Sequence, residues 1–191
     1  MEERKRPSFD PYDEKENPKP FIFVSYSHRD EEVTADLEEL SKRGFRIWYD
    51  EGILAGVDWG QSIDEHIKTC NALVIFVSNQ AVKSPFVLSE WEMADEKGIP
   101  VLPVVLRKEE DTGVHYKALL TLQGIMRWKY GNRLNDYYDD LCKKLESIAP
   151  QTRADAYERD SKTLGLGYLP TLKDILCDSK TSLTPGEQDC S

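Results

Sequence analysis

The feature that most constrains this chain is the regular alternation of short apolar runs with segments of helical period. Five runs suit strands: FIFVSY at 21–26, FRIWYD at 45–50, ALVIFVS at 72–78, VLPVVL at 101–106 and QGIMRW at 123–128. Short, nearly continuous apolar runs are typical of strands that are buried on both faces of a parallel sheet. The alternation therefore predicts an α/β doubly wound sheet whose five parallel strands are joined by right-handed crossovers.

Helical segments lie between these runs. The first, within 27–44, shows an S-x-x-D capping pattern at Ser27 and Asp30 and is closed by Gly44. Pro103 leaves the fourth apolar run without one backbone N–H donor for pairing in a sheet, but its apolar neighbours still favour a strand there. Further helices are predicted at 61–70, from Ser84 and Pro85 onward, at 114–120 and at 132–149.

The two ends of the chain differ in composition from its middle. Residues 1–19 combine several prolines and mixed charges with no hydrophobic period, which predicts a disordered N-terminal segment. Residues 20–149 hold the whole α/β pattern and form the predicted domain. After Pro150 the period is lost, so we expect a C-terminal extension at 150–191 that is largely flexible.

Composition excludes several classes of function. The net charge of -10 argues against a nucleic-acid-binding protein, because phosphate recognition needs a basic surface. No apolar run approaches the about 20 residues that span a bilayer, and the charged, proline-rich N-terminus is unlike a secretory signal peptide. We therefore expect a cytoplasmic protein that does not bind membranes.

The cysteines and histidines do not suggest a metal site. None of the four cysteines forms a C-x-x-C pair, and no combination of cysteine and histidine has the spacing of a zinc site. In a cytosolic chain the thiols are expected to be reduced. No metal ion and no resident cofactor are predicted.

Glu90 is the residue that most invites a functional explanation. In a helix that starts at Ser84 and Pro85, Phe86, Val87, Met93 and Ala94 cluster on one side. Glu90 projects from the middle of that apolar stripe, although the helix has polar faces that also hold glutamates. A structural explanation stays open, because Glu90 could bond a backbone N–H or the nearby Lys97.

In an open parallel sheet, ligands bind beyond the carboxyl ends of the strands. Glu90 lies one to two turns into the helix that follows the third strand, so we expect it to face that crevice together with Tyr26, Ser27, Trp48, Asp50 and Phe86. The chain has no G-x-G-x-x-G after its first strand, no Walker A loop and no G-x-S-x-G elbow. A response regulator is disfavoured as well, because the third strand ends in Ser78 and not in a phosphoacceptor aspartate.

Four blocks together resemble the TIR (Toll/interleukin-1 receptor) domain, most closely its short bacterial form. They are FVSYSHRDEE, GFRIWYDEGILAGVDWGQSIDEHI, ALVIFVSNQAVKSPFVLSEWEMA and IPVLPVVL, in the family's order and spacing across 20–149. The resemblance implies a flavodoxin-like sheet of order 2-1-3-4-5 with helices on both faces. It also implies one of two functions, because some members cleave NAD+ and others are interaction modules.

In the enzymatic members a W-x-x-x-E motif supplies a catalytic glutamate. The resemblance implies that Glu90 is this catalytic residue, with Phe86 in the place of the tryptophan. It further implies that Tyr26, Ser27, Asp50 and Trp59 contact NAD+. The BB loop, at 50–59, is expected to gate the pocket and to mediate self-association between TIR domains.

These positions favour an NAD+ glycohydrolase or ADP-ribosyl cyclase, which would act in signalling or antiphage defence. Cleavage of NAD+ releases neutral nicotinamide, so the reaction needs no general acid and a single carboxylate near the ribose is sufficient. The alternative is a non-catalytic interaction module that binds other TIR domains through the BB loop. NAD+ is expected as a substrate and not as a cofactor.

Overall fold

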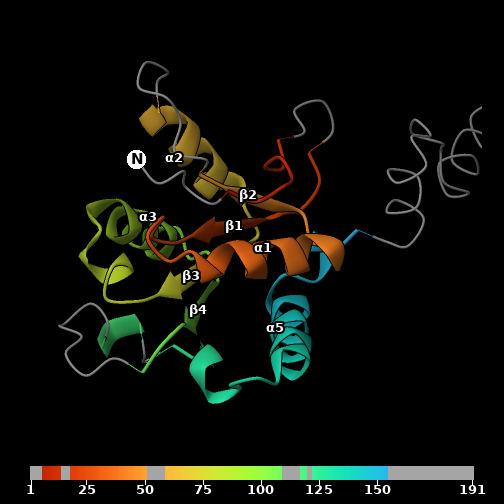
Figure 1. The fold of residues 1–191 in the computed structure, drawn as a ribbon. Helices are drawn as coiled ribbons and strands as arrows, with labels where there is room; N and C mark the ends of the chain where they lie inside the picture. Colours follow the sequence, from red (N-terminus) through yellow and green to blue (C-terminus); the bar gives the residue numbers. More distant parts are fainter. Residues whose placement is uncertain (1–5, 14–17, 51–58, 109–116, 120–121, 155–191) are drawn as a thin grey trace, which may run out of the picture. The chain divides into compact units, whose positions relative to one another are not determined.

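The computed structural model describes residues 6–13, 18–50, 59–108, 117–119 and 122–154, with the backbone alone at 59–62. Five parallel strands form one sheet in the order β2-β1-β3-β4-β5 (Figure 1). This confirms the predicted sheet and its strand order. The strands are β1 (Ile22–Ser25), β2 (Ile47–Tyr49), β3 (Ala72–Val77), β4 (Val101–Val105) and β5 (Ile125–Met126).

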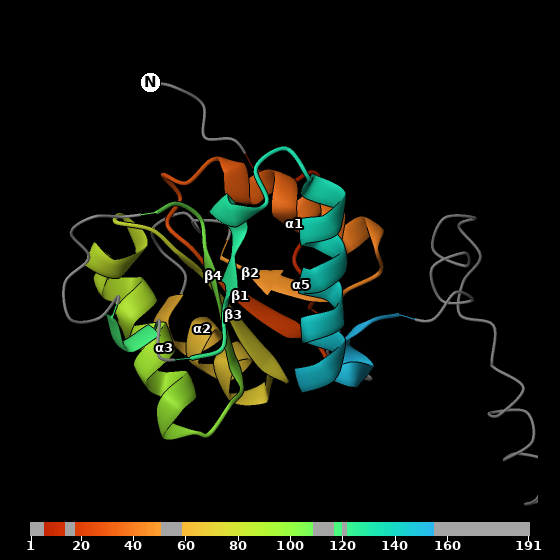
Figure 2. The ribbon, with the colours of Figure 1, turned by 90° about the horizontal axis from the view of Figure 1, so that it is seen from below.

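Helices cover both faces of the sheet, as predicted. Helices α1 (Glu32–Lys42) and α5 (Leu134–Ile148) lie on one side, and α2 (Trp59–Thr69) and α3 (Pro85–Glu96) lie on the other (Figure 2). Three single turns of 3-10 helix follow strands or helices: η1 (Ala81–Lys83), η2 (Arg127–Lys129) and η3 (Pro150–Thr152). Residues 117–119 are helical, and the rest of the helix predicted at 114–120 lies outside the described residues.

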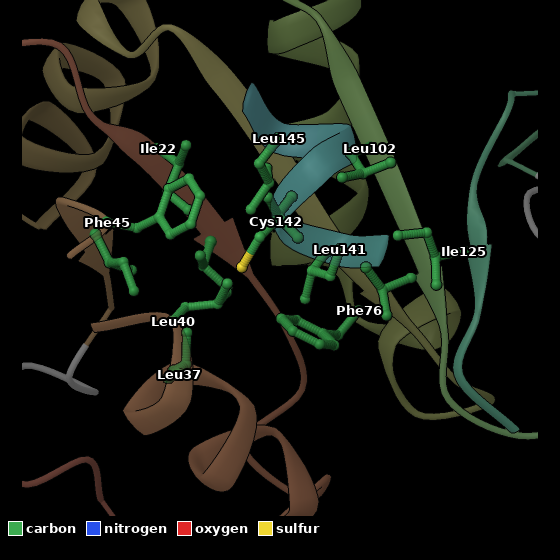
Figure 3. Close-up of a cluster of buried hydrophobic side chains, with 14 of the residues drawn as sticks. Ile22, Leu37, Leu40, Phe45, Phe76, Leu102, Ile125, Leu141, Cys142 and Leu145 are labelled. Carbon is green, nitrogen blue, oxygen red and sulfur yellow. The ribbon is translucent and has the colours of Figure 1, made fainter. Parts of the chain in front are cut away.

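Alternate residues of each strand face opposite layers. Ile22 and Val24 of β1 join the core beneath α1 and α5, to which Leu37, Leu40 and Leu141 also belong (Figure 3). Phe23 of β1 faces the core beneath α2 and α3. Every residue of β3 is buried, which explains its continuous apolar sequence.

The first helix starts later than its sequence predicts. It begins at Glu32, and no side chain caps its N-terminus. A turn from Ser27 to Asp30 comes first, in which the Asp30 amide donates to the Ser27 carbonyl at 2.8 Å. The S-x-x-D pattern is therefore not a capping box, because the Asp30 carboxylate instead accepts from Ser78 at 2.5 Å.

Pro103 is accommodated in β4 because the neighbouring strand pairs only beyond it. The pairing of β4 with β5 covers Val104 and Val105 alone. Next to this pairing, Gly124 lies so close to Pro103 that a Cβ atom on it would come within 2.5 Å of the Pro103 carbonyl oxygen. A proline in a central strand is thus tolerated where the partner strand is short and is preceded by glycine.

The prediction of a disordered segment at 1–19 is wrong for residues 6–13. Phe9 packs against the core beneath α1, and its carbonyl accepts a hydrogen bond from the Tyr49 hydroxyl at 2.5 Å. Tyr12 packs against the opposite core, and its amide donates to the Ile47 carbonyl at 2.8 Å. The segment therefore crosses the open edge of β2, and these contacts offset the cost of ordering it.

The packed unit also extends slightly beyond the predicted boundary at 149. Phe45 and Arg153 form an antiparallel bridge, Thr152 is fully buried, and the Ala154 amide donates to the Gly44 carbonyl at 2.7 Å. This unit ends at Ala154. The flexibility expected for 155–191 concerns residues outside the described part of the chain and stays a prediction.

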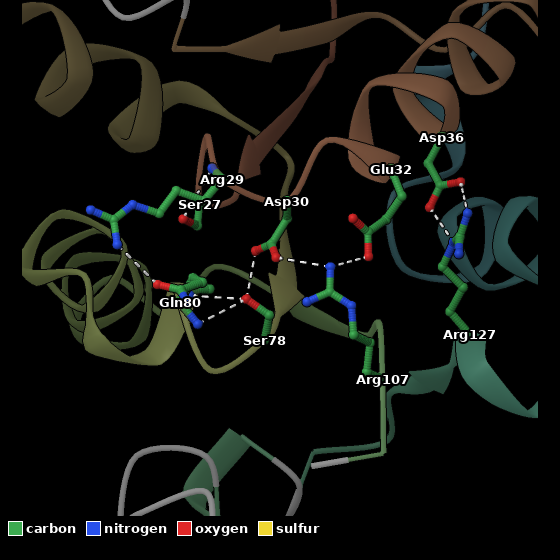
Figure 4. Close-up of polar contacts among 10 residues, drawn as sticks. Ser27, Arg29, Asp30, Glu32, Asp36, Ser78, Gln80, Arg107 and Arg127 are labelled. Carbon is green, nitrogen blue, oxygen red and sulfur yellow. Dashed lines mark hydrogen bonds and ion pairs between the residues drawn. The ribbon is translucent and has the colours of Figure 1, made fainter. Parts of the chain in front are cut away.

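A buried polar network joins α1 to the far end of the sheet. Asp36 has no exposed side-chain surface, and its carboxylate accepts hydrogen bonds from Arg127, Tyr137 and Tyr138 at 2.8 to 3.1 Å (Figure 4 shows the Arg127 pair). Burial raises the pKa of Asp36, whereas the Arg127 guanidinium lowers it. The carboxylate is satisfied only while all three partners remain.

We expect Arg127→Ala to lower the free energy of unfolding by about 3 kcal/mol, because it leaves the Asp36 carboxylate buried without its cation. Arg133→Ala is the matched control, since it breaks an exposed pair with Asp136 and should change stability by less than about 0.5 kcal/mol. Urea denaturation of both variants measures the difference. Equal losses would show that the Asp36 network adds no more than a surface ion pair.

Candidate functional site

The carboxyl ends of the strands gather the polar residues that the sequence placed there. Ser25 ends β1, Asp50 follows β2, Ser78 follows β3 and Arg107 lies just beyond β4. Helix α3 starts as predicted: Pro85 is its first residue, and the Ser84 hydroxyl accepts from the Val87 amide at 3.5 Å. This start fixes the rotation of α3 and with it the direction in which Glu90 points.

Glu90 lies on the buried side of α3, with 7% of its surface exposed. Its Oε2 atom accepts a hydrogen bond from the Ser25 hydroxyl at 2.5 Å. Ser25 is itself buried, with 2% exposed. Lys97 is exposed and is not a partner of Glu90 among the contacts of the described residues. Among the residues that the structure describes, the carboxyl is therefore held by a neutral hydroxyl from the adjacent strand and not by a cation.

The surroundings of Glu90 favour its neutral form. Burial raises its pKa from 4.5 to about 7, because the charged carboxylate is poorly solvated there. The hydrogen bond from Ser25 lowers this pKa, and the negative charge of Asp50 raises it. Near neutral pH the group is therefore divided between its two forms and responds strongly to any charge brought next to it.

Two of the predicted contact residues lie away from Glu90. Tyr26 points to the opposite face of the sheet, where it packs against the core beneath α1 and pairs edge-on with His28. The Ser27 hydroxyl accepts from the Arg29 amide at 3.4 Å within its own loop. Strand alternation explains the placement of Tyr26, because Phe23 and Ser25 share the face of Glu90, whereas Ser27 lies beyond the end of β1 in a turn. The same alternation could have identified Ser25 from the sequence.

The other predicted residues are placed in different ways. Asp50 is close enough to influence the ionisation of Glu90, and its backbone carbonyl contacts the His28 ring at 3.1 Å. Phe86 lies one turn before Glu90 on α3 and is 56% exposed, so its side chain is accessible to solvent. Trp48 is a core residue, stacked on Phe23 and on His66.

The predicted BB loop is mostly outside the part of the chain that can be described. Trp59 is the first residue of α2, but its side chain and residues 51–58 are not among those described. The roles of Trp59 and of this loop therefore stay predictions.

A second polar network ties the loop after β1 to the neighbouring strands (Figure 4). Asp30 bonds Ser78 after β3 and Arg107 after β4, and Arg107 also pairs with Glu32 of α1. Arg29 extends over the start of η1 and donates to Gln80 at 3.3 Å. The loop that follows Ser25 is thus anchored to residues beyond β3 and β4, which steadies the end of β1.

A pocket of about 130 Å³ opens on the α1 side of the strand ends. Its walls bring four carboxylates together with one arginine, Arg6, and one histidine, His28. Ligand sites usually have a volume of at least about 300 Å³, so this pocket is small for one. The negative charge of its walls would also repel a diphosphate. The pocket therefore does not suit a dinucleotide. Its acidic residues are Asp10, Asp30, Glu31 and Asp50.

Within the described ranges, no helix combines the length and apolar character needed to cross a membrane. No group of three histidine, cysteine, aspartate or glutamate side chains in those ranges could hold a metal ion.

The raised pKa of Glu90 makes a prediction about stability. Between pH 4.5 and about 7, the folded state keeps a proton that the unfolded state has released, so the free energy of unfolding falls as pH rises through this window. Glu90→Gln removes this titration. Across that window, we expect the free energy of unfolding of the variant to rise by about 3 kcal/mol relative to that of the wild type.

Urea denaturation at several pH values measures this difference. Glu92→Gln is the control, because Glu92 is exposed on the same helix and its substitution should show no such trend with pH. A constant difference between wild type and Glu90→Gln at all pH values would show that Glu90 ionises normally.

Comparisons with known proteins agree with this architecture. A family model described as "TIR domain" matches residues 22–143. The uncharacterized protein y4lF of Sinorhizobium fredii is 34% identical over 98 residues, which make up 46% of this chain and 30% of that protein. The chain thus matches only about a third of the length of this relative.

A solved structure shows the same fold. The crystal structure of the TIR domain of the Toll-related receptor TRR-2 from Hydra magnipapillata has a TM-score of 0.53 at 13% identity, and covers 65% of this chain and 97% of that chain. The TIR domains of the activated Roq1 resistosome have a TM-score of 0.41 at 17% identity, and the match covers 84% of this chain and 99% of that chain. The family match spans more than half of the chain, and so this protein belongs to the TIR domain family.

Proposed function

We propose that this TIR domain cleaves NAD+ at the bond between nicotinamide and ribose, as a glycohydrolase or an ADP-ribosyl cyclase. The observation that supports this most is the placement of Glu90. Its carboxyl is buried at the carboxyl end of the sheet, where open α/β sheets bind ligands, and is held by Ser25 instead of being neutralised by a cation.

The proposed reaction needs one carboxylate. The bond from ribose C1′ to the nicotinamide nitrogen breaks with both electrons going to the nitrogen, so a cationic ring leaves as a neutral molecule. Positive charge develops on the ribose, and a negative group beside it lowers the barrier, more so where water is excluded. Water then adds to C1′ and loses a proton, or a nitrogen of the adenine ring adds in its place.

The ionisation of Glu90 suits this sequence of events. In the protein alone, burial favours the protonated form of Glu90, with a pKa of about 7. The nicotinamide ring of NAD+ carries a positive charge, and a nearby positive charge lowers the pKa of a carboxyl. Binding of the substrate would therefore convert Glu90 to the charged form that the reaction uses. Asp50, whose negative charge raises the pKa of Glu90, would be attracted to the same cation.

Phe86 is proposed to stack on a flat ring of the substrate. Its ring is more than half exposed at the rim of the site, one helical turn from Glu90. Stacking on an exposed aromatic side chain adds to affinity without entering the chemistry. Its place corresponds to the tryptophan of the family motif, whose larger ring would offer more contact area.

The wider setting is also a proposal. We infer that the protein acts in signalling or antiphage defence, that it is cytoplasmic and that it self-associates through TIR-TIR contacts involving the BB loop at 50–59. The family membership supports self-association as a general expectation. A non-catalytic module that only binds other TIR domains is the competing outcome of the experiment below.

Nicotinamide release tests the proposal. The wild-type protein is incubated with NAD+ over a range of protein concentrations, including conditions that force assembly, and the products are separated by chromatography. We expect release by the wild type, and Glu90→Gln should reduce the rate by at least about a hundredfold, because the group that stabilises the developing charge is lost. Glu92→Gln, which changes an exposed glutamate of the same helix, should retain activity.

Two results would contradict the proposal. Absence of nicotinamide at every concentration, together with measurable self-association, would identify an interaction module. Equal rates for the wild type and Glu90→Gln would remove Glu90 from the reaction.

The role of Phe86 makes a separate prediction. Phe86→Ala should raise KM about three- to tenfold with little change in kcat, because the loss of a stacking contact weakens binding without altering the reacting groups. Phe86→Trp should lower KM. The same chromatographic assay at varied NAD+ concentration measures both. A fall in kcat at unchanged KM would assign Phe86 to the chemistry instead of to binding.

A further inference from the structure

We propose that Ser25 is a positioning residue of this site: its hydroxyl holds the Oε2 atom of Glu90 so that the Oε1 atom is presented to the ribose. This inference deepens the proposed function and rests on it. Tyr26 and Ser27, the neighbours that sequence reasoning selected, do not touch Glu90. Ser25 does so directly, through a 2.5 Å hydrogen bond.

The first support is the rigidity of the donor. β1 lies between β2 and β3 in the sheet, and Ser25 itself pairs with Ile75 of β3. With 2% of its surface exposed, Ser25 has almost no water to bond instead. A hydroxyl fixed on a central strand therefore defines where one carboxyl oxygen of Glu90 must lie. A charge-stabilising group acts best when it is held before the reaction begins.

The second support is that the two carboxyl oxygens of Glu90 differ in their contacts. Among the described residues, Ser25 supplies the hydrogen bond to Glu90, and it goes to Oε2. A carboxylate has capacity for several hydrogen bonds. Oε1 is therefore the atom that can accept from a ribose hydroxyl or face the cationic carbon. Rotation about the last bond of the side chain would exchange the two oxygens, and the Ser25 bond opposes that rotation.

The third support comes from the ionisable groups around Glu90. β3 and β4, which pack against α3, contain no ionisable side chain, and Lys83 of η1 is exposed. Asp50 after β2 is the group whose charge raises the pKa of Glu90, whereas the Ser25 hydroxyl lowers it. Ser25 thus also keeps the carboxyl ready to ionise. Helix α2 also packs against α3, and the ionisable residues among its described side chains are Asp64, Glu65, His66 and Lys68.

Three variants test this role. Ser25→Ala removes the hydroxyl, Ser25→Thr keeps it on a residue that strands accommodate well, and Ser147→Ala makes the same chemical change at an exposed position of α5. For each, kcat and KM for NAD+ are measured as a function of pH. Thermal unfolding of each variant shows that it is folded.

We expect Ser25→Ala to lower kcat about ten- to a hundredfold at nearly unchanged KM, as befits the loss of a hydrogen bond to a charged group. The acid limb of its pH profile should move to higher pH, because the bond that favours ionisation is gone. Ser25→Thr should recover most of both effects, and Ser147→Ala should match the wild type. An unshifted pH profile with wild-type kcat in Ser25→Ala would overturn the proposal.

A second measurement does not depend on activity. The ionisation of Glu90 is followed by 13C NMR of its side-chain carboxyl, assigned by comparison with Glu90→Gln, in the wild type and in Ser25→Ala. A higher pKa in Ser25→Ala supports the coupling of Ser25 to Glu90, and an unchanged pKa overturns it. If the wild type releases no nicotinamide, the proposed function fails, while this titration still decides whether Ser25 governs Glu90.

Discussion

The burial of β3 on both of its faces is the constraint on which the rest of this structure depends. Its six residues, from Ala72 to Val77, are wholly enclosed, so helices must cover the sheet on each side. Helix α3 is one of these covers, and it brings Glu90 against the end of β1. The low polarity that stabilises the sheet is thus the same low polarity that raises the pKa of Glu90.

The protein holds its buried carboxylates in two different ways. Asp36 is neutralised by Arg127 and fixed by two tyrosine hydroxyls, which joins α1 to α5 and the last strand. Glu90 has a neutral serine as its partner and a like charge, Asp50, in its surroundings. The first arrangement binds elements together, whereas the second leaves a carboxyl that a cationic ligand can ionise. This contrast within one domain is the main physical support for a functional role of Glu90.

Much of the fold could be predicted from local patterns. The apolar runs gave five strands because a strand buried on both faces tolerates few polar residues, and Ser84 with Pro85 marked the start of α3. The predictions were wrong where a distant partner decides the outcome. Asp30 bonds Ser78 and not its own helix, and residues 6–13 are ordered by contacts with β2. No local pattern reports such contacts, because they join residues that are far apart in the chain.

The sequence by itself determined that Glu90 occupies the apolar side of a helix next to the third strand, because helical period is a local property. Which groups surround that carboxyl was decided only by the tertiary structure. It selected Ser25 over Tyr26 because the pleat of β1 sends alternate side chains to opposite faces and α3 covers one of them. It selected Ser25 over Ser27 because β1 ends at Ser25 and Ser27 lies in the turn that follows. The ionisation of Glu90 was also decided only by the tertiary structure, because it depends on the burial and the charges that packing brings around this residue.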